Sequence, residues 1–183
     1  MKKLLFTFLL AVVSFTSNIV NAASVVVVFA PENGYHDDAF YDIAEKAIRQ
    51  YTNDVIIGPE IDSAYEEFVA EQGSSWRLQM FPAFADEYDC DYWMRIFINR
   101  SHDWGGTHIN GHTGKRTDLH MIGLSVSVVM TRPDGSDNCG ESASFYSDHG
   151  NMSTKDPVLL TREVFAKDLE AILPVGISRR LRQ

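Results

Sequence analysis

A clear alternation between His120 and Thr131, with an apolar residue at every second position from Ile122 to Met130, constrains the fold of this chain more than any other feature. Successive side chains of a β-strand point to opposite faces of a sheet, so the pattern predicts a strand with one apolar and one polar face. The polar face carries Ser125, Ser127 and Thr131. The residues expected on the apolar face are His120, Ile122, Leu124, Val126, Val128 and Met130. Such a strand belongs to a sheet with helices packed on one face and with its other face partly exposed.

The remaining patterns predict strands and helices that first alternate and then give way to a meander of strands. Strands are expected in SVVVVFAPENG, in DVIIGP, from Asp91 to Asn99, from His120 to Thr131 and from Glu141 to Tyr146. Helices are expected from Asp37 or Asp38 to Tyr51, from Ile61 to Gln72 and from Pro82 to Tyr88. A last helix is expected to run from Thr161, its capping residue, to Leu173. The fold class is therefore α/β (α+β), a mixed sheet of about five strands with helices mainly on one face, in the order β-α-β-α-α-β-β-β-α. Residues 100–118, rich in glycine, histidine and threonine, are expected to form a long hairpin connection.

The amino terminus has the pattern of a bacterial signal peptide. A pair of lysines precedes an apolar run from Leu4 to Phe15, and small residues follow near Ala22. We expect residues 1–22 to be removed and residues 23–183 to form a single periplasmic domain. The apolar run is short for a membrane span and no cysteine stands at the cleavage point, so neither membrane insertion nor a lipid anchor is expected.

The charge and motif content exclude some classes of ligand. A formal net charge of −9 disfavours a nucleic-acid partner, because phosphates repel an acidic chain. The sequence has no phosphate-binding loop and no dinucleotide fingerprint, so no cofactor is expected.

The chain contains two cysteines, Cys90 and Cys139. In an oxidising compartment two cysteines most often pair. A disulfide that closes a loop of about 50 residues is worth roughly 4 kcal/mol in the chain-entropy model. We therefore predict a Cys90–Cys139 disulfide that ties the start of the third strand to the last hairpin.

Aromatic residues near the middle of the chain suggest an interaction surface. Alternation places Trp93, Arg95 and Phe97 on the face of the third strand opposite Met94 and Ile96. If helices cover the Met94 face, this trio lies outside, and such residues are enriched where proteins meet proteins. The alternative is that the connection 100–118, or the segment around Trp76, folds over them. Trp104, in that connection, is the fourth residue expected to take part in the interaction.

The sequence leaves two kinds of chemistry as alternatives. His102, His108 and His112 are the candidate ligands if the hairpin binds a metal, although its glycines argue against the helix on which a spacing of four would serve a zinc site. Ser147, Asp148 and His149 are adjacent, but neighbours on an extended segment point in different directions and no G-x-S-x-G elbow is present. No catalytic site is expected.

The stretch FADEYDCDYWMRIFI resembles the helix-to-strand passage of a group of bacterial periplasmic domains. The group includes the amino-terminal domain of TolB, the Tol-system translocation protein, lipoprotein activators of penicillin-binding proteins, the curli export lipoprotein and accessory proteins of Vibrio-type flagella. The opening VVVVFAPENGYHDDAFYDIAEKAIRQ is similar to their first strand and helix, and LSVSVVMTRPDG is similar to a later strand and turn. The resemblance implies a small α/β envelope domain that binds other envelope proteins and catalyses nothing.

Together these patterns predict a periplasmic, non-enzymatic protein-interaction module, an accessory component of a flagellar, secretion or cell-wall assembly. Its expected partners are other cell-envelope proteins, and it is a possible homo-oligomer. A periplasmic metal-binding protein is the second hypothesis, and a small secreted hydrolase is the third.

Overall fold

The computed structural model describes residues 22–31, 37–71 and 81–182. The expected signal peptide, apart from Ala22, and Trp76 lie outside the described residues. The elements are β1 (Val25–Pro31), α2 (Ala39–Ile48), β2 (Val55–Ile56), α3 (Pro59–Glu71), α4 (Phe81–Asp86), β3 (Tyr92–Ile109), β4 (Arg116–Thr131), β5 (Cys139–Tyr146), η2 (Ser147–Gly150), α5 (Pro157–Ile172), η3 (Leu173–Ile177) and α6 (Ser178–Leu181). No helix among the described residues is long and apolar enough to cross a bilayer.

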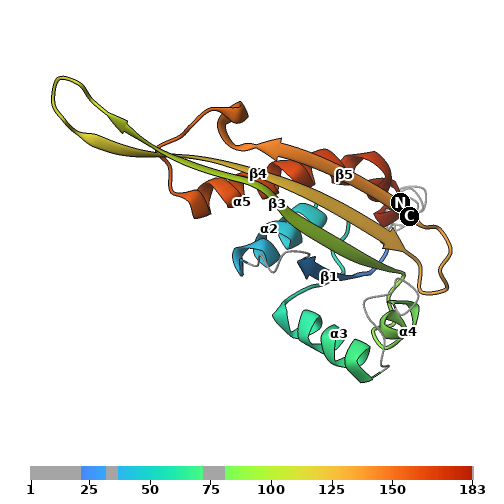
Figure 1. The fold of residues 1–183 in the computed structure, drawn as a ribbon. Coiled ribbons are helices and arrows are strands. Elements are labelled where there is room, and N and C mark those ends of the chain that lie inside the picture. The colour runs from blue at the N-terminus through green and yellow to red at the C-terminus, as the bar shows by residue number, and fades with distance from the viewer. Residues whose placement is uncertain (1–21, 32–36, 72–80, 183) are drawn as a thin grey trace, which may run out of the picture.

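The strands form one five-stranded mixed sheet in the order β2-β1-β3-β4-β5. β1 runs parallel to both β2 and β3, whereas β3, β4 and β5 form an antiparallel meander (Figure 1). The predicted fold class and the order of the elements are confirmed. β1 is buried on both faces, as its continuous apolar run requires.

The main hydrophobic core lies on one face of the sheet, beneath α2, α5, η3 and α6. Every residue from Ile122 to Met130 that was expected on the apolar face of β4 is fully buried there. Phe40 of α2 and Phe165 of α5 meet in this core with ring centroids 4.3 Å apart. Arg162 of α5 also binds Asp37, just before α2, through two nitrogen–oxygen contacts of 2.8 and 2.9 Å. These contacts fix α2 and α5 against each other.

A second, smaller core lies on the opposite face, where α3 and α4 cover β1 and the first part of β3. Tyr65 of α3 and Phe84 of α4 pack edge to face in it, with ring centroids 5.1 Å apart. Asp62 of α3 accepts hydrogen bonds from the Phe29 N–H at 2.8 Å and from the Tyr41 hydroxyl at 2.7 Å. The first of these bonds satisfies a backbone donor of β1 beyond the end of β2. The other half of this face, over β4 and β5, is serine-rich and partly exposed, as predicted.

The last helix begins earlier than the sequence suggested. Asp156 caps it by accepting from the backbone N–H groups of Val158 and Leu159, and Pro157 is its first residue. Thr161, expected as the cap, lies inside the helix and donates its hydroxyl proton to the Pro157 carbonyl at 2.8 Å. The helix ends before Pro174, which sits in the π-helical turn η3.

The main departure from expectation is the segment 100–118. Most of it is β-structure: β3 and β4 continue pairing to Ile109 and Arg116. The connecting turn contains Asn110, whose side chain accepts from the N–H groups of His112 and Thr113, and Gly114, which has a φ of +67°. The two strands therefore project beyond the rest of the sheet as a ribbon, which we call the arm (residues 103–122; Figure 1).

Candidate interaction surface

Trp93 and Arg95 do not lie on an exposed face. Trp93 is 2% exposed and belongs to the core beneath α3 and α4, and Arg95 is 7% exposed. Phe97 is half-buried, and the Arg95 guanidinium lies 4.0 Å from the centre of its ring. The expectation that this trio is outside is therefore wrong for its first two members. The covering elements are helices α3 and α4, which local sequence patterns do not place on this face.

Trp104 is exposed, as its predicted role requires, with 45% of its surface accessible. A β-bulge between Asn99 and His102 places two residues of β3 opposite one residue of β4. The bulge shifts the alternation by one, so that His102 and Trp104 face the same side of the sheet as Trp93 does earlier in the strand. This local irregularity turns Trp104 onto the serine-rich face of the sheet.

Three aromatic rings meet on that face at the base of the arm. His102 and Trp104 stack with centroids 4.5 Å apart and planes 10° from parallel, and Tyr146 of β5 stacks on His102 at 5.7 Å. Tyr146 and His102 both pair with Gly123 of the intervening strand. Because glycine has no side chain, the two rings can meet across β4.

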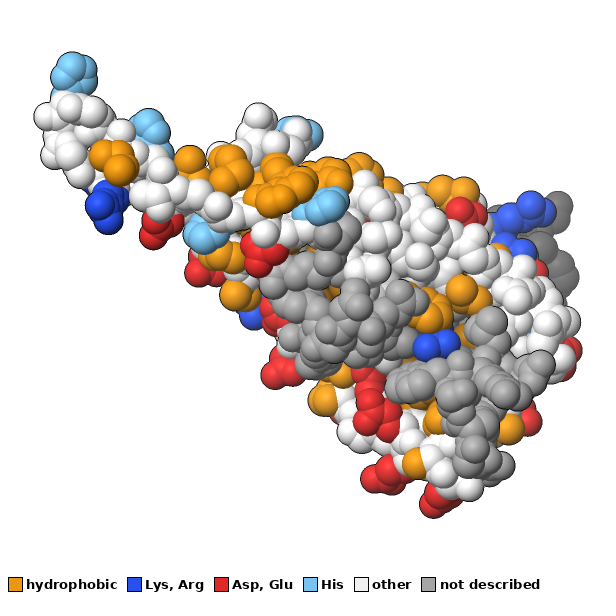
Figure 2. Space-filling model, viewed as in Figure 1, with side chains coloured by type: hydrophobic (Ala, Val, Ile, Leu, Met, Phe, Trp, Pro, Cys, Tyr) orange, Lys and Arg blue, Asp and Glu red, His pale blue; other side chains and the backbone are white. Residues whose placement is uncertain are grey.

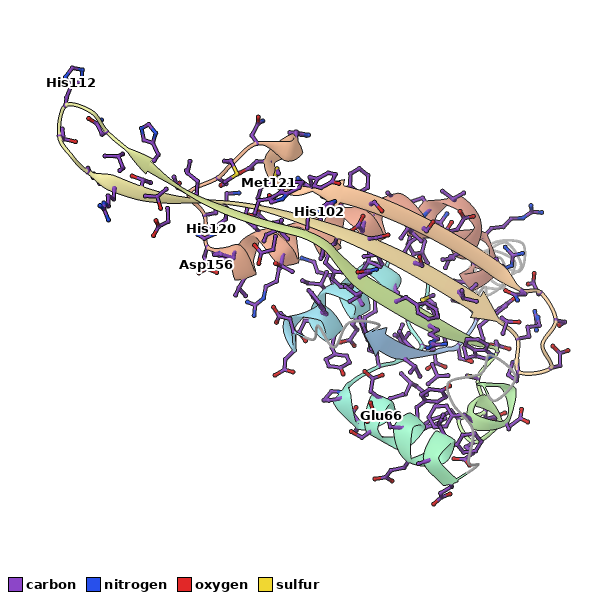
Figure 3. The ribbon with its side chains drawn as sticks, in the orientation of Figure 1. Glu66, His102, His112, His120, Met121 and Asp156 are labelled. Atoms are coloured by element: carbon purple, nitrogen blue, oxygen red, sulfur yellow. The ribbon has the colours of Figure 1, made fainter. Side chains whose placement is uncertain are left out.

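Two methionines extend this cluster toward the arm. Met121 is the partner of Trp104 in β4 and is half-buried. Met152 is 40% exposed, and its Cε lies 3.5 Å from the position that a Cβ would take on Gly106. We call this set the aromatic–methionine patch (His102, Trp104, Met121, Tyr146 and Met152). Figure 2 shows hydrophobic side chains gathered along the base of the arm, and Figure 3 shows His102 and Met121 there, with His112 at the far end.

Hydroxyl groups border the patch on the body of the sheet. Ser125 of β4 pairs with Ser144 of β5, and their hydroxyl oxygens are hydrogen-bonded at 2.9 Å. Ser127 and Ser142 form the next pair along the same two strands. An exposed apolar patch with a polar border has the composition of a protein-binding surface.

The three candidate metal ligands are not brought together. His102 is stacked at the base of the arm, His108 is further along β3 and His112 is in the terminal turn. Among the described residues, no group of three or more histidine, cysteine, aspartate or glutamate side chains lies close enough to hold a metal ion.

Ser147, Asp148 and His149 also fail to assemble into a triad. The Ser147 hydroxyl oxygen accepts a hydrogen bond from the Ile122 N–H at 3.0 Å, so its role is to satisfy the backbone of β4. Asp148 and His149 follow in left-handed backbone conformations, with φ of 43° and 55°.

The predicted disulfide is not formed, and Cys90 and Cys139 are both thiols. Cys90 packs in the small core with Trp93, whereas Cys139 packs against the main core on the other face. The sheet therefore separates two side chains that a disulfide would need within a few ångströms of each other. Burial raises the pKa of both thiols.

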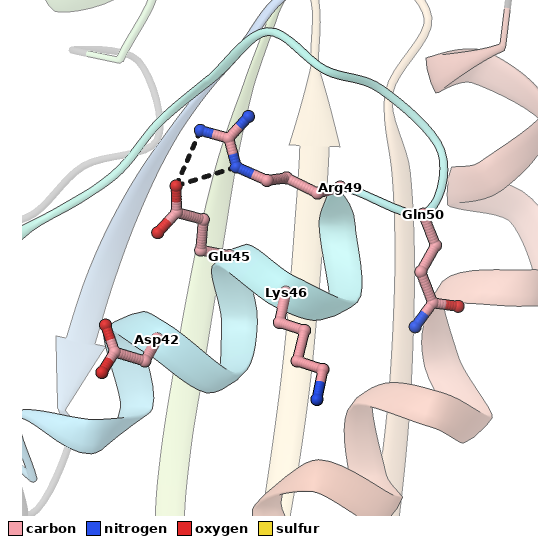
Figure 4. A pocket seen from close by; sticks show the side chains of 5 residues that line it. All are labelled: Asp42, Glu45, Lys46, Arg49 and Gln50. Atoms are coloured by element: carbon pink, nitrogen blue, oxygen red, sulfur yellow. Dashed lines mark hydrogen bonds and ion pairs between the residues drawn. The ribbon is translucent and has the colours of Figure 1, made fainter.

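A separate surface hollow follows α2 and is lined by Asp42, Glu45, Lys46, Arg49 and Gln50 (Figure 4). Arg49 and Glu45 form an ion pair of 2.7 Å one helical turn apart. Such exposed pairs stabilise a helix by about 0.3–0.5 kcal/mol. The hollow has the character of a solvated helix surface, and we assign no binding role to it.

The fold and its surface define a mixed α/β domain with a projecting β-hairpin. No protein family matches the chain, and neither does any curated protein. Among solved structures it is similar to lipoprotein GNA1162 from Neisseria meningitidis, with 14% identity, 79% of this chain and 94% of that chain covered, and a TM-score of 0.41. It is also similar to the PelC dodecamer from Paraburkholderia phytofirmans, with 14% identity, 89% of each chain covered and a TM-score of 0.47.

A third similar structure is the hypothetical protein CT253 from Chlamydia trachomatis, with 10% identity, 87% of this chain and 98% of that chain covered, and a TM-score of 0.41. At these values the likeness is a loose one of fold. The particular resemblance to TolB and its relatives stays a prediction.

Proposed function

We propose that this chain is a periplasmic, non-enzymatic interaction module, an accessory component of a cell-envelope assembly that binds another envelope protein through the aromatic–methionine patch. The signal-peptide pattern at the amino terminus supports export. The observation that carries the proposal is the exposure of large apolar side chains at the base of the arm: Trp104 is 45% exposed, and Tyr146 and Met152 are each 40% exposed.

The chemistry of the patch suits a protein partner. Tryptophan and tyrosine are the side chains that most often dominate binding energy at interfaces, and methionine adapts its shape to a partner surface. The patch contains no carboxylate, although the chain as a whole has a net charge of −9. An apolar side chain of the partner would therefore be buried against it without the cost of desolvating a charge.

The patch is also ordered before binding. His102 and Tyr146 hold each other in a stack, and the strands that carry them are paired through Gly123. Side chains that are already ordered lose little conformational entropy on association. The metal-binding alternative is not proposed, because the three candidate histidines lie apart.

Photocrosslinking in intact cells tests the proposal. A photoreactive phenylalanine analogue is placed at Trp104, and in a control at Ile109, which is 55% exposed on the same strand but faces the other side of the arm. We expect an adduct with a second envelope protein from position 104 and none from position 109. Equal adducts from both positions, no adduct from position 104, or an adduct that contains only two copies of this chain would contradict the proposal.

A further inference from the structure

Within the described part of the chain, no strand pairs with the outer edge of β5. β5 is the last strand in the sheet order, and its partner is β4 (Figure 1). The segments that precede and follow β5 are both described, because the structure describes residues 81–182 without a gap. The opposite edge of the sheet is β2, which has only two residues, whereas β5 has eight. β5 is therefore the long edge of this sheet.

The hydrogen bonds of β4 fix which residues of β5 direct their backbone groups outward. The Ile122 N–H donates to the hydroxyl oxygen of Ser147, directly after β5, so Ile122 directs its backbone groups toward the β5 side. By alternation, so do the even-numbered residues of β4 as far as Met130. Their partners in β5 are the odd-numbered residues from Cys139 to Phe145. The even-numbered residues of β5 therefore direct their N–H and C=O groups outward: Gly140, Ser142, Ser144 and Tyr146.

This edge lacks the features that usually prevent strands of two molecules from pairing. β5 contains no lysine and no proline, and its register with β4 runs without a shift from Cys139 to Tyr146. Each residue of β5 that directs its backbone groups outward is exposed. On the other side of the sheet, by contrast, the Phe29 N–H of β1 is already bonded to Asp62. The edge of β5 is thus ready to accept a further strand.

We propose that two copies of this chain pair antiparallel through the outer edges of β5, about a twofold axis at Ala143. The outward-directed residues from Gly140 to Tyr146 are symmetric about Ala143, so this register pairs every one of them. Ser142 of one copy lies opposite Ser144 of the second, and Gly140 lies opposite Tyr146. Each of these pairs exchanges both of its backbone hydrogen bonds. The two sheets then form one continuous sheet.

The side chains on the serine-rich face fit this register. Tyr146 of one copy covers Gly140 of the second, where an aromatic ring fills the space that glycine leaves empty. The hydroxyl groups of Ser142 and Ser144 lie opposite each other, and opposed hydroxyl residues stabilise an antiparallel pair. An axis at Ser142 or at Ser144 would move Tyr146 away from Gly140. It would also leave outward-directed groups at one end of β5 without a partner.

A surface hollow of about 560 Å³ lies beside this edge on the face that α5 covers. Phe145, Lys167 and Glu170 are among the residues that line it, and Phe145 is 40% exposed. Lys167 has no ion-pair partner within the described part of the chain, and neither has Glu141. Glu141 is at the other end of β5, where its Oε1 lies 3.1 Å from the position that a Cβ would take on Gly176. Within one copy, the two unpaired charges are therefore at opposite ends of the strand.

The antiparallel register brings these charges together between the copies. It places Glu141 of the second copy opposite Phe145, so that its carboxylate enters the hollow that Lys167 lines. This complementarity indicates that the added strand is a second copy of this chain. The edge also suits contact between two acidic chains, because Glu141 is the one charged residue of β5 in a chain with a net charge of −9. The pairing does not depend on the proposed function, since Trp104 takes no part in it.

Ser142→Pro in the purified chain tests the backbone pairing. Proline removes an N–H that points outward, and the hydrogen bonds between β4 and β5 are kept. Ser142→Ala is the matched control, because it loses the same hydroxyl group and keeps the N–H. By sedimentation we expect Ser142→Pro to raise the dimer dissociation constant at least about tenfold over Ser142→Ala, since a hydrogen bond is lost from both copies. A chain that stays monomeric at all concentrations, or equal constants for the two variants, would overturn the proposal.

Exchange of the two charges tests the register and does not require the strand to tolerate proline. Lys167→Glu and Glu141→Lys should each raise the dimer dissociation constant at least about threefold, because an attraction becomes a repulsion in both copies. The double variant reverses both charges of each contact, so it should dimerise about as tightly as the wild type. Single variants that dimerise like the wild type, or a double variant no tighter than either single variant, would contradict the arrangement.

Discussion

His102 of β3 and Tyr146 of β5 stack with ring centroids 5.7 Å apart across Gly123 of β4, which separates the strands that carry them. The contact joins residues 44 positions apart in the sequence through a position that has no side chain. It also holds Trp104 in place, since the Trp104 ring is parallel to both within 10°. Gly123 is thus the residue on which the aromatic–methionine patch depends.

Replacement of Gly123 by valine should disrupt this stack. The new side chain would occupy the space between His102 and Tyr146, and overpacking of this kind costs about 1–3 kcal/mol. Ser127→Val is the control, because it adds apolar volume on the same face further along the strand, where the neighbour in β5 is Ser142. Urea denaturation should show a loss of stability for Gly123→Val and a change within about 0.5 kcal/mol for the control. Similar losses in both variants would show that Gly123 has no special role.

Two tryptophans in the same strand should respond in opposite ways to truncation. Trp93 is 2% exposed beneath α3 and α4, so Trp93→Ala should lower the free energy of unfolding by about 3–5 kcal/mol. Trp104 is 45% exposed, so Trp104→Ala should cost less than about 1 kcal/mol while reducing partner capture. Chemical denaturation of the two variants checks the first expectation. If Trp104→Ala is as destabilising as Trp93→Ala, the patch is a structural element and not a docking surface.

Stability should fall as the pH rises because of Asp168. This residue of α5 is fully buried, and burial raises the pKa of its carboxyl group to about 8. An unfolded aspartate has a pKa near 3.9, so between about pH 4 and pH 8 the folded state binds the additional proton. Ionisation of Asp168 therefore lowers the free energy of unfolding as the pH rises, by up to about 1.4 kcal/mol per pH unit. The stability gained from the protonated carboxyl group is fully lost once the pH passes the pKa of the folded state.

The variant Asp168→Asn isolates this effect. It cannot ionise, so its free energy of unfolding should depend less on pH across this range than that of the wild type, whatever its absolute stability. Denaturation curves at several pH values measure both slopes. If the free energy of unfolding depends on pH equally in the variant and the wild type, Asp168 is ionised in the folded protein.

The two cysteines should behave as thiols of different accessibility. Cys139 is half-buried at the edge strand β5, whereas Cys90 is 8% exposed in the small core. Iodoacetamide reacts with the thiolate, and burial raises the pKa of both groups, so labelling of the folded chain should be slow. Mass spectrometry should find the label on Cys139 first and on Cys90 after unfolding. Labelling that requires a reductant would restore the disulfide hypothesis.

Local periodicity was a good guide to the elements and to one face of the sheet. The apolar residues of β4 were assigned to the core from alternation alone, and the structure buries them, because side-chain direction in a strand follows from backbone geometry. Alternation could not show which elements cover the face of β3 on which Trp93 lies. Alternation shows that Trp93 and Met94 face opposite sides, but not that α3 and α4 cover the Trp93 side, which depends on long-range packing.

The sequence predicted a hairpin connection at 100–118, but the strand pairing within it was missed for a related reason. Residues 100–118 have weak strand propensity, with four glycines and several polar residues. Their pairing continues the pairing of β3 with β4 in the body of the sheet and is not specified by local sequence. The patch was also beyond local patterns, because it needs the register that brings Tyr146 and His102 to the two sides of Gly123. A glycine within an otherwise regular strand was the one signal that could have pointed to it.

The sequence by itself determined the order of the elements, the apolar face of β4 and the overall acidity of the chain, since each depends on composition or on the spacing of neighbouring residues. The tertiary structure alone decided which aromatic residues are buried, which face each cysteine occupies and which rings meet across Gly123. These depend on contacts between residues far apart in the chain, and their energies favour one packing of the helices and one strand register that no short stretch of the sequence specifies.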